Sequence, residues 1–443
     1  MVLSSTDAKG ILDRVLSYTK ADEAEATLTM GEQGNIRFAR NIPTTSGEHG
    51  GISLNISCTF GRRTGSSSTT QTDEQSLRDA VRRAETLARL APESPEYMPR
   101  LGPQTYRRTP EWDDATVDLP AAERAKIAAQ AIGAAREKDL MAAGYFENRN
   151  GCVAIANTKG LFGYHPSTSA SYTLTMRTAD GSGSGWAAAE SFRYGAIDPG
   201  ALTRRAMEKA IRSQKPADIE PGIYPVILEP SAVGDMINLY RWNLNRRAAD
   251  EGRSFFSDPD HGTKLGRKIF DERITIYSDP MNSLVPSRPW DDDGMPVERT
   301  MWAEKGVQRN LAVGRFWARE KGLPSIPWGT NVIMEGEDHS IDDLVAASDR
   351  ALLVTSFWYI RQVDPKTILY TGLTRDGVFL VEKGRIVGPV INLRWNESPI
   401  AVFRNVEMMS RPERAVTREG NQPMLVPALK VKEFHFTSVS TST

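Results

Sequence analysis

The segment 51–60, GISLNISCTF, restricts the fold more than any other stretch of this sequence. Apolar side chains alternate there with small polar ones, at Ile52, Leu54, Ile56, Cys58 and Phe60. A two-residue period is typical of a β-strand that buries one face and exposes the other. We therefore expect Cys58 on the buried face of a strand in a sheet that is covered on one side.

Helices and strands are predicted in the same order twice before residue 218. The first set comprises helix 6–20, strands near 24–30, 35–39 and 51–60, and helix 72–90. The second set comprises helix 118–139, strands within 152–157 and 171–178, and helix 198–214. Each set ends in a proline-rich stretch, at 91–104 and 216–222. Proline there disfavours both a helix and the hydrogen bonds between β-strands. The repetition favours an internal duplication.

The second half of the chain is rich in strand patterns with helices inserted between them. A hairpin is predicted over 377–390 with its turn at Lys383–Gly384, and a late strand over 427–438. This order indicates an α+β fold rather than regular β-α-β alternation. We predict two domains: an N-terminal domain of helices on antiparallel strands (1–218) and a strand-rich C-terminal domain (219–443).

Composition excludes several classes of protein. The formal net charge is −1, so no basic excess indicates a nucleic-acid partner. No apolar run is long enough for a membrane span, and the first ten residues are too polar for a secretory signal, so we expect a cytoplasmic protein. Only Cys58 and Cys152 are present; two reduced thiols fit that compartment better than a disulfide, which stays an alternative.

Short motifs indicate no catalytic or metal site. The five histidines are too far apart for an H-x-H or H-E-x-x-H pair. We expect His165, which precedes a proline, at the surface, and His435, which shares strand parity with Leu429 and Val431, in the core. The acidic stretches 258–262 and 291–294 do not match a twelve-residue calcium loop and are typical of turns.

A helix is predicted within 234–247, directly after the buried-looking strand 224–230. Its apolar residues recur at three- and four-residue steps, at Val233, Met236, Ile237, Tyr240 and Leu244. A helix after a buried strand is a common place for an active site, yet this one carries no metal ligand and no group that would exchange a proton near neutral pH.

Several segments, in order, resemble the TldD/PmbA family of TldD–TldE peptidases. These are NIRFARN (35–41), the strand and helix at 224–247, RSFFSD (253–258), DDDGMPVERTMWAEKGVQRNL (291–311) and YTGLTRDGVFLVEKGRIVGPVINLRWNESP (370–399). Each match is weak alone, but together they span nearly the whole chain. The resemblance implies that the helix after strand 224–230 occupies the place of a metallopeptidase helix.

Catalytic members of this family carry H-E-x-x-x-H on that helix, and a cysteine near the C-terminus adds a zinc ligand. Counting back from RSFFSD places the first histidine near Asn238, the glutamate near Leu239 and the second histidine near Trp242. No histidine occurs anywhere within 232–250, and the corresponding C-terminal stretch 413–422 has no cysteine. The resemblance therefore implies a degenerate site with no catalytic and no metal-binding residue in this chain.

By this resemblance the chain is a TldE/PmbA-like subunit that is inactive alone. Zinc and activity would come from a TldD-like H-E-x-x-x-H partner in a cytoplasmic heterodimer that cleaves unfolded or short peptides. A homodimer that binds peptides without cleaving them is the alternative. A hydrolase that uses some other set of residues is a third, which no motif supports.

Four residues are candidates for lining a peptide cavity or a subunit interface. Arg241 and Trp242 lie beside the expected ligand positions, and Arg375 and Asp376 precede the hairpin. The opposing interpretations are an exposed charge at Arg241, core packing at Trp242, and an exposed salt bridge between Arg375 and Asp376 worth less than about 1 kcal/mol.

Overall fold

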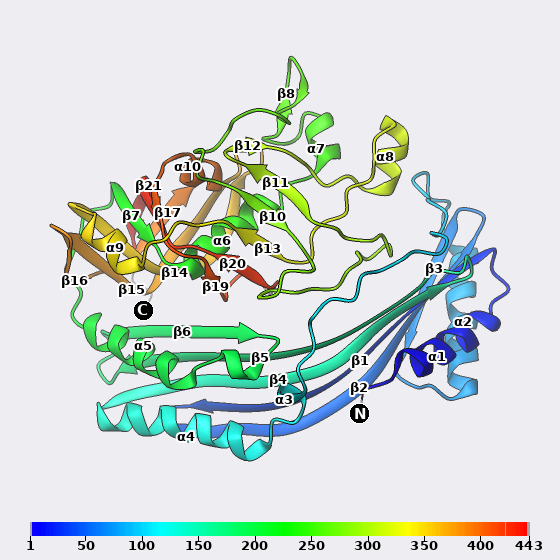
Figure 1. Cartoon of the computed structure of the whole chain (residues 1–443), viewed down its shortest axis with the longest axis horizontal. Coiled ribbons are helices and arrows are strands. Elements are labelled where there is room, and N and C mark those ends of the chain that lie inside the picture. Colours follow the sequence, from blue (N-terminus) through cyan, green and yellow to red (C-terminus); the bar gives the residue numbers. More distant parts are fainter. Residues whose placement is uncertain (1, 421, 441–443) are drawn as a thin grey trace.

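A computed structural model describes residues 2–420 and 422–440, and Figure 1 shows a long sheet lying beneath a more irregular region. The sheet is antiparallel throughout, in the order β3-β2-β1-β4-β5-β6. Its strands are β1 (Glu23–Ala39), β2 (Ile42–Phe60), β3 (Arg63–Thr69), β4 (Leu140–Asn157), β5 (Phe162–Thr178) and β6 (Ser184–Ser191).

One face of this sheet carries the helices. They are α1 (Ser5–Ser17), α2 (Glu74–Leu90), α4 (Ala121–Glu137) and α5 (Pro199–Arg212), with α3 (Asp114–Val117) and the 3-10 turn Tyr194–Ala196 between them. In Figure 1, α1 and α2 lie at one end of the strands and α4 and α5 at the other. Ala26 and Ile36 have the same parity in β1 and enter the two separate apolar clusters beneath these pairs. All four helices therefore cover the same face, as the alternating pattern predicts.

The predicted alternation in 51–60 is confirmed, because Leu54, Ile56 and Cys58 are fully buried beneath α1 and α2. Cys58 and Cys152 both lie in this apolar cluster as free thiols. Burial raises the pKa of both thiols, so both favour the protonated form.

The separate strands predicted at 24–30 and 35–39 are one strand, β1. Gly31 and Gly34 lie within this strand, and each pairs with β2 on one side and β4 on the other. A Cβ on the facing Gly151 would lie 2.3 Å from the Met30 carbonyl oxygen, so glycine here permits close approach of strands rather than a turn. Helix α2 is capped by Asp73, which accepts from the amide of Ser76.

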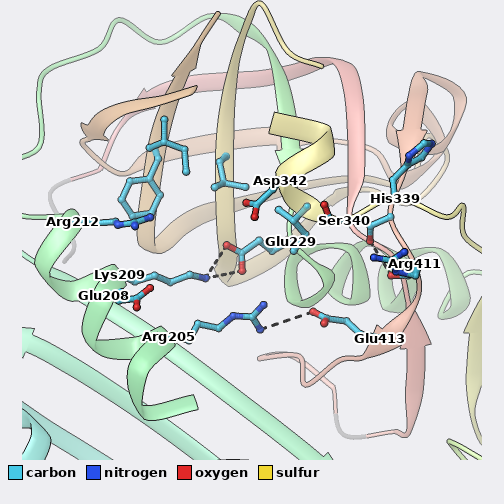
Figure 2. Close-up of a pocket in the computed structure, with 15 residues that line it drawn as sticks. Arg205, Glu208, Lys209, Arg212, Glu229, His339, Ser340, Asp342, Arg411 and Glu413 are labelled. Carbon is cyan, nitrogen blue, oxygen red and sulfur yellow. Dashed lines mark hydrogen bonds and ion pairs between the residues drawn. The ribbon is translucent and has the colours of Figure 1, made fainter. Parts of the chain in front are cut away.

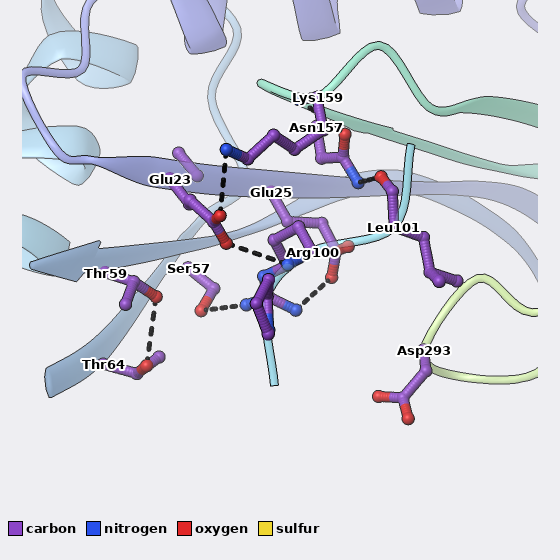
Figure 3. Close-up of polar contacts among 12 residues, drawn as sticks. Glu23, Glu25, Ser57, Thr59, Thr64, Arg100, Leu101, Asn157, Lys159 and Asp293 are labelled. Atoms are coloured by element: carbon purple, nitrogen blue, oxygen red, sulfur yellow. Dashed lines mark hydrogen bonds and ion pairs between the residues drawn. The ribbon is translucent and has the colours of Figure 1, made fainter. Parts of the chain in front are cut away.

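The proline-rich stretch after α2 is held between the bare face of the sheet and the second region. Arg100 donates to Glu25 (2.9 Å) and Ser57 (2.8 Å), and its amide donates to Glu23 (2.8 Å; Figure 3). On the other side, Arg247 forms an ion pair with Glu96 at 2.8 Å. This extended segment is thus an ordered layer between the two regions, although it has no helix or strand of its own.

The second region contains a closed ring of five strands. β7 (Ile223–Leu228) pairs with β14 (Arg350–Asp364) and β21 (Leu429–Val439), and β21 then pairs with β17 (Leu393–Glu397). β15 (Leu369–Glu382) joins β17 to β14 and closes the ring, while β16 (Arg385–Val390) and β18 (Val406–Met409) add at its sides. The predicted turn is confirmed, because Lys383 and Gly384 both have positive φ, 48° and 74°.

A second six-stranded sheet lies beside the ring. Its strand order is β12-β11-β10-β13-β20-β19. Strands β8 and β9 form a separate two-stranded sheet. The bounds are β8 (Ser257–Asp258), β9 (Gly262–Thr263), β10 (Ile276–Ser278), β11 (Thr300–Glu304), β12 (Val307–Gln308), β13 (Val332–Met334), β19 (Glu413–Arg414) and β20 (Met424–Val426). The helices of this region are α6 (Pro230–Arg241), α7 (Arg246–Asp250), α8 (Arg315–Lys321), α9 (Ile341–Ala346) and α10 (Pro399–Arg404).

The α+β fold with a strand-rich second half is therefore confirmed, and the boundary at 218/219 stays a prediction. No described helix combines the length and the apolar character that crossing a bilayer requires.

Candidate functional site

Helix α6 lies between the ring and the second sheet. It begins after Glu229 with Pro230 in its first turn, where a missing amide hydrogen costs nothing. Its predicted apolar stripe is buried: Val233, Met236, Ile237 and Tyr240 are all 0% exposed. The Tyr240 hydroxyl donates to Gln308 at 3.0 Å, which satisfies the one polar atom of that stripe.

The other face of α6 is covered by the segment 415–422, of which Asn421 lies outside the described residues. Ser231 donates to the carbonyl of Val416 at 2.9 Å. Asn238 donates to Thr417 at 3.3 Å and accepts from the side-chain amide of Gln422. This segment follows β19 and leads into β20, so a sheet edge brings it onto the helix.

Two glycines let the helix and this segment approach closely. A Cβ on Gly234 would lie 2.5 Å from a methyl carbon of Thr417, and one on Gly420 would lie 2.4 Å from the side-chain nitrogen of Asn238. No room is therefore left on this face for a larger side chain, and imidazole at position 234 would displace the segment.

Asp235 is the ionisable residue of this face. It is 0% exposed, one carboxyl oxygen accepts weakly from the Glu419 amide (3.4 Å), and the other has no hydrogen-bond partner among the described residues. Burial raises the pKa of Asp235 to about 8, so the carboxyl is largely protonated at neutral pH. This corrects the expectation that the helix carries no group that exchanges a proton near neutral pH.

These side chains do not fit a zinc ion. Zinc in proteins is held by thiolate, imidazole and carboxylate, whereas this face offers an amide, two hydroxyls and a protonated acid. Within residues 2–420 and 422–440, no three side chains of the His, Cys, Asp and Glu types are grouped to hold a metal. Such a face can form hydrogen bonds, but it has no ionised base to activate water.

The three positions that counting assigned to the degenerate motif are not brought together. Asn238 contacts the covering segment, Leu239 is buried in the apolar core, and Trp242 forms the C-cap and is 48% exposed. The structure instead groups Gly234, Asp235 and Asn238. The distance from RSFFSD could not fix the helical register, because the residues between include a turn of unpredictable length.

Arg241 is not a solvated surface charge. Its guanidinium donates to the carbonyl of Gly329 and lies 6.0 Å from the ring centroid of Trp328. Burial lowers the pKa of Arg241. The exposure of Trp242 likewise excludes the core-packing interpretation for that residue.

Asp376 does not form an exposed salt bridge with Arg375, contrary to our expectation. It is 2% exposed, accepts from Ser184 at 2.6 Å and pairs with Arg418, whereas Arg375 is 3.9 Å away. Arg375 instead stacks on Trp358, at 4.9 Å. The local sequence of the hairpin gave no sign of these partners from β6 and from the covering segment.

Arg418 completes this junction. It stacks on Trp186 (4.4 Å) and Trp358 (5.6 Å) while it pairs with Asp376. The cluster thus joins β6, β14, β15 and the segment that covers α6. Asp235, Ser184, Arg418 and Trp186 were all missed from the sequence, because their grouping depends on contacts between distant segments.

Both histidine expectations are corrected. His165 is buried and its Nε2 lies 2.9 Å from Glu111, because Pro166 is accommodated within β5 and does not end the strand. His435 is 47% exposed at its side chain and pairs with buried Glu397 at 2.7 Å. A register shift between Val431 and Phe434 reverses the strand parity from which a core position was inferred.

Comparisons with known proteins agree with this architecture. Three family models match in order: PmbA/TldA metallopeptidase domain 1 at residues 24–88, the central domain at 115–214 and the C-terminal domain at 221–438. A protein of Methanothermobacter thermautotrophicus described as a metalloprotease is 24% identical over 314 residues, which is 66% of this chain and 67% of that protein.

Two solved structures share the fold at low sequence identity. TldE from Thermococcus kodakarensis superposes with a TM-score of 0.85 at 17% identity, over 98% of this chain and 100% of that chain. A protein of Thermotoga maritima gives 0.83 at 18% identity, over 97% and 100%. Because three models of the family match it in order and the fold is shared, the chain belongs to the PmbA/TldD metallopeptidase family.

Proposed function

We propose that this chain is a non-catalytic, TldE-like subunit of a two-component zinc metallopeptidase. The observation that carries the proposal is the face of α6: Asn238, Gly234 and a protonated Asp235 occupy it, and the segment 415–422 covers it. A face of this composition cannot hold zinc or activate water. The metal and the general base would then belong to an H-E-x-x-x-H subunit.

The partner would be a TldD-like subunit in the cytoplasm, and the substrates unfolded or short peptides. A subunit without catalytic residues contributes by enclosing the site, so that extended chains enter and folded proteins do not. An extended peptide can also add its backbone to a strand edge, a mode of binding that depends little on sequence. Arg241, Trp242 and Arg375 remain candidates for lining such a cavity or interface, whereas Asp376 is buried in its contacts with Ser184 and Arg418.

The test is metal analysis and a peptidase assay of the purified chain, alone and mixed with an H-E-x-x-x-H homologue. We expect less than stoichiometric zinc and no turnover of an unstructured peptide by the chain alone. Mixing should give a heterodimer in size-exclusion chromatography and turnover that a chelator abolishes.

Stoichiometric zinc in the lone chain, or turnover by it, would overturn the proposal. If the chain forms a homodimer that binds peptide and does not associate with the H-E-x-x-x-H homologue, the alternative of a self-standing peptide-binding protein is favoured instead. Turnover that survives the chelator would indicate a hydrolase that uses other residues.

A further inference from the structure

A cleft of about 450 Å³ opens between α5 of the first region and the outer side of the five-stranded ring (Figure 2). One wall is the face of α5 that carries Arg205, Lys209 and Arg212, at four- and three-residue steps. The facing wall comes from Glu229 at the start of α6 and from the beginning of α9. The cleft lies within a single chain and needs no partner subunit.

The floor of the cleft is a buried ion pair. The Lys209 ammonium donates to both carboxylate oxygens of Glu229, at 2.8 and 2.6 Å, with side chains only 13% and 11% exposed. Burial lowers the pKa of Lys209. Arg205 approaches Glu413 at 3.9 Å on one side of this pair. These four charges are therefore already compensated.

Three further charges at the cleft, on Arg212, Asp342 and Glu208, have no such partner among the described residues. Arg212 on α5 and Asp342 on α9 have neither a hydrogen bond nor an ion pair with any described residue, and Figure 2 places them on different walls without a contact between them. Glu208, also on α5, is unpaired among those residues as well. The Arg212 guanidinium can therefore pair with an anionic group of a ligand, and the Asp342 or Glu208 carboxylate with a cationic group.

Apolar side chains complete the lining. They are Leu353 and Phe379 from the ring, Ile341 from α9 and Ile386 from the edge strand β16. Ligand sites are usually apolar clefts of a few hundred to a thousand Å³ with a few converging polar groups, often where domains meet. This cleft has that size and that place, but charged and polar side chains outnumber the four apolar ones in its lining.

We propose that the cleft binds a small zwitterion with an apolar body, of the kind that an apolar α-amino acid or a dipeptide provides. The ligand carboxylate pairs with Arg212 beside Lys209, the ligand ammonium pairs with Asp342, and the apolar body packs against Phe379 and Ile386. This binding requires neither hydrolytic activity nor a partner subunit. The chain could therefore bind such a ligand whether or not it is the non-catalytic subunit of a peptidase.

The first experiment uses the purified full-length chain and isothermal titration calorimetry. The probes are leucine, the dipeptide Leu-Leu, and Leu-Leu blocked by acetylation at its amine or by amidation at its carboxyl group. We expect saturable binding of leucine or Leu-Leu and at least about a tenfold loss on blocking either end, since each block removes one charge pair. Equal binding of free and blocked dipeptides, or no saturation at millimolar probe, would overturn the proposal.

Variants then locate the site. Arg212→Gln and Ile386→Ser change exposed or half-exposed side chains, so both should fold, and each should weaken binding about tenfold or more. Lys264→Gln, whose ammonium lies over Phe255 away from the cleft, is the matched control and should bind as the parent chain does. Thermal melting checks that each variant is folded. Unchanged binding by both cleft variants would place the ligand elsewhere and refute the assignment.

Discussion

Asp376 has a structural role that its neighbours in sequence do not reveal. It adopts φ of 57°, which Asp tolerates better than most residues, and it is buried between Ser184 and Arg418. Removing one partner of a buried ion pair leaves the other charge uncompensated, which costs more than the pair itself contributes.

We therefore expect Asp376→Asn to lower the free energy of unfolding by about 3–5 kcal/mol, because Arg418 loses its counter-charge. Asparagine adopts the same backbone conformation, so strain is not introduced. Asp338→Asn is the matched control: its carboxylate is 90% exposed and pairs with Arg411 at the surface, so about 1 kcal/mol or less should be lost. Urea denaturation measures both, and equal losses would contradict the buried role.

Asp235 should make stability depend on pH. Its pKa is raised to about 8 in the folded protein, while an unfolded aspartate titrates near 3.9. Between those values the folded state holds a proton that the unfolded state has released, so the free energy of unfolding falls as pH rises. The contribution of the protonated Asp235 carboxyl to the free energy of unfolding is fully present below about pH 4 and is lost as pH rises towards 8.

Asp235→Asn has no proton to lose in this range. Relative to the parent chain, its stability should therefore improve by about 2.6 kcal/mol between pH 5 and pH 7. Urea denaturation at pH 5, 6 and 7 measures the difference. Asp292→Asn, whose side chain is 97% exposed, should show no such trend. A constant difference between Asp235→Asn and the parent chain would exclude a protonated carboxyl at this position.

At the scale of elements, the two edge strands of the large sheet each carry a glycine beneath a helix. A Cβ on Gly65 of β3 would lie 2.2 Å from the Ala88 nitrogen of α2. A Cβ on Gly185 of β6 would lie 2.2 Å from the Ala206 oxygen of α5. The same close packing at both edges repeats with the helix–three strands–helix order, which agrees with the predicted duplication.

Gly185→Ala should push α5 away from β6 and lower the free energy of unfolding by about 1–3 kcal/mol, because the obstructing atoms belong to the helix backbone. Gly133→Ala is the control. It lies within α4 with no atom within 4 Å of its Cβ, so it should stabilise by about 0.4–1 kcal/mol. Thermal or urea unfolding followed by circular dichroism compares them, and a neutral Gly185→Ala would show that α5 can shift freely.

At the scale of the whole molecule, Trp290 docks the second region onto the sheet. It is 1% exposed and packs with Ile155 and Leu161, and its ring centroid is 4.8 Å from that of Tyr106. The Tyr106 hydroxyl also donates to the carbonyl of Gly294 at 2.6 Å. Together with the Lys209–Glu229 and Asp376–Ser184 contacts, this packing ties the regions into one body.

Trp290→Ala should cost about 3–5 kcal/mol and reduce the dependence of unfolding on urea concentration, because the two regions then unfold less cooperatively. Trp242→Ala serves as the control, since that ring is 48% exposed and should cost less than about 1 kcal/mol. Urea titration followed by far-ultraviolet circular dichroism gives both midpoint and slope. The docking role would be wrong if the two variants unfolded alike.

Local periodicity was enough to predict many individual elements. The alternation at 52–60 predicted which side of β2 is buried, and three- and four-residue steps predicted the helices and the apolar face of α6. The Lys383–Gly384 turn followed from the need for positive φ. Local rules failed where long-range pairing overrode them. The segments 24–30 and 35–39 form one strand through their pairing with β2 and β4, and a register shift precedes His435.

The sequence by itself determined that no histidine occurs within 232–250, and the order of its segments pointed to the family. Only the tertiary structure decided which residues occupy that face, because Asn238, Asp235 and the segment 415–422 meet through sheet pairing between distant strands. The same holds for Asp376 with Ser184, 192 residues apart, and for the charged cleft beside α5. Periodicity records which side of an element is buried, but not what it is buried against.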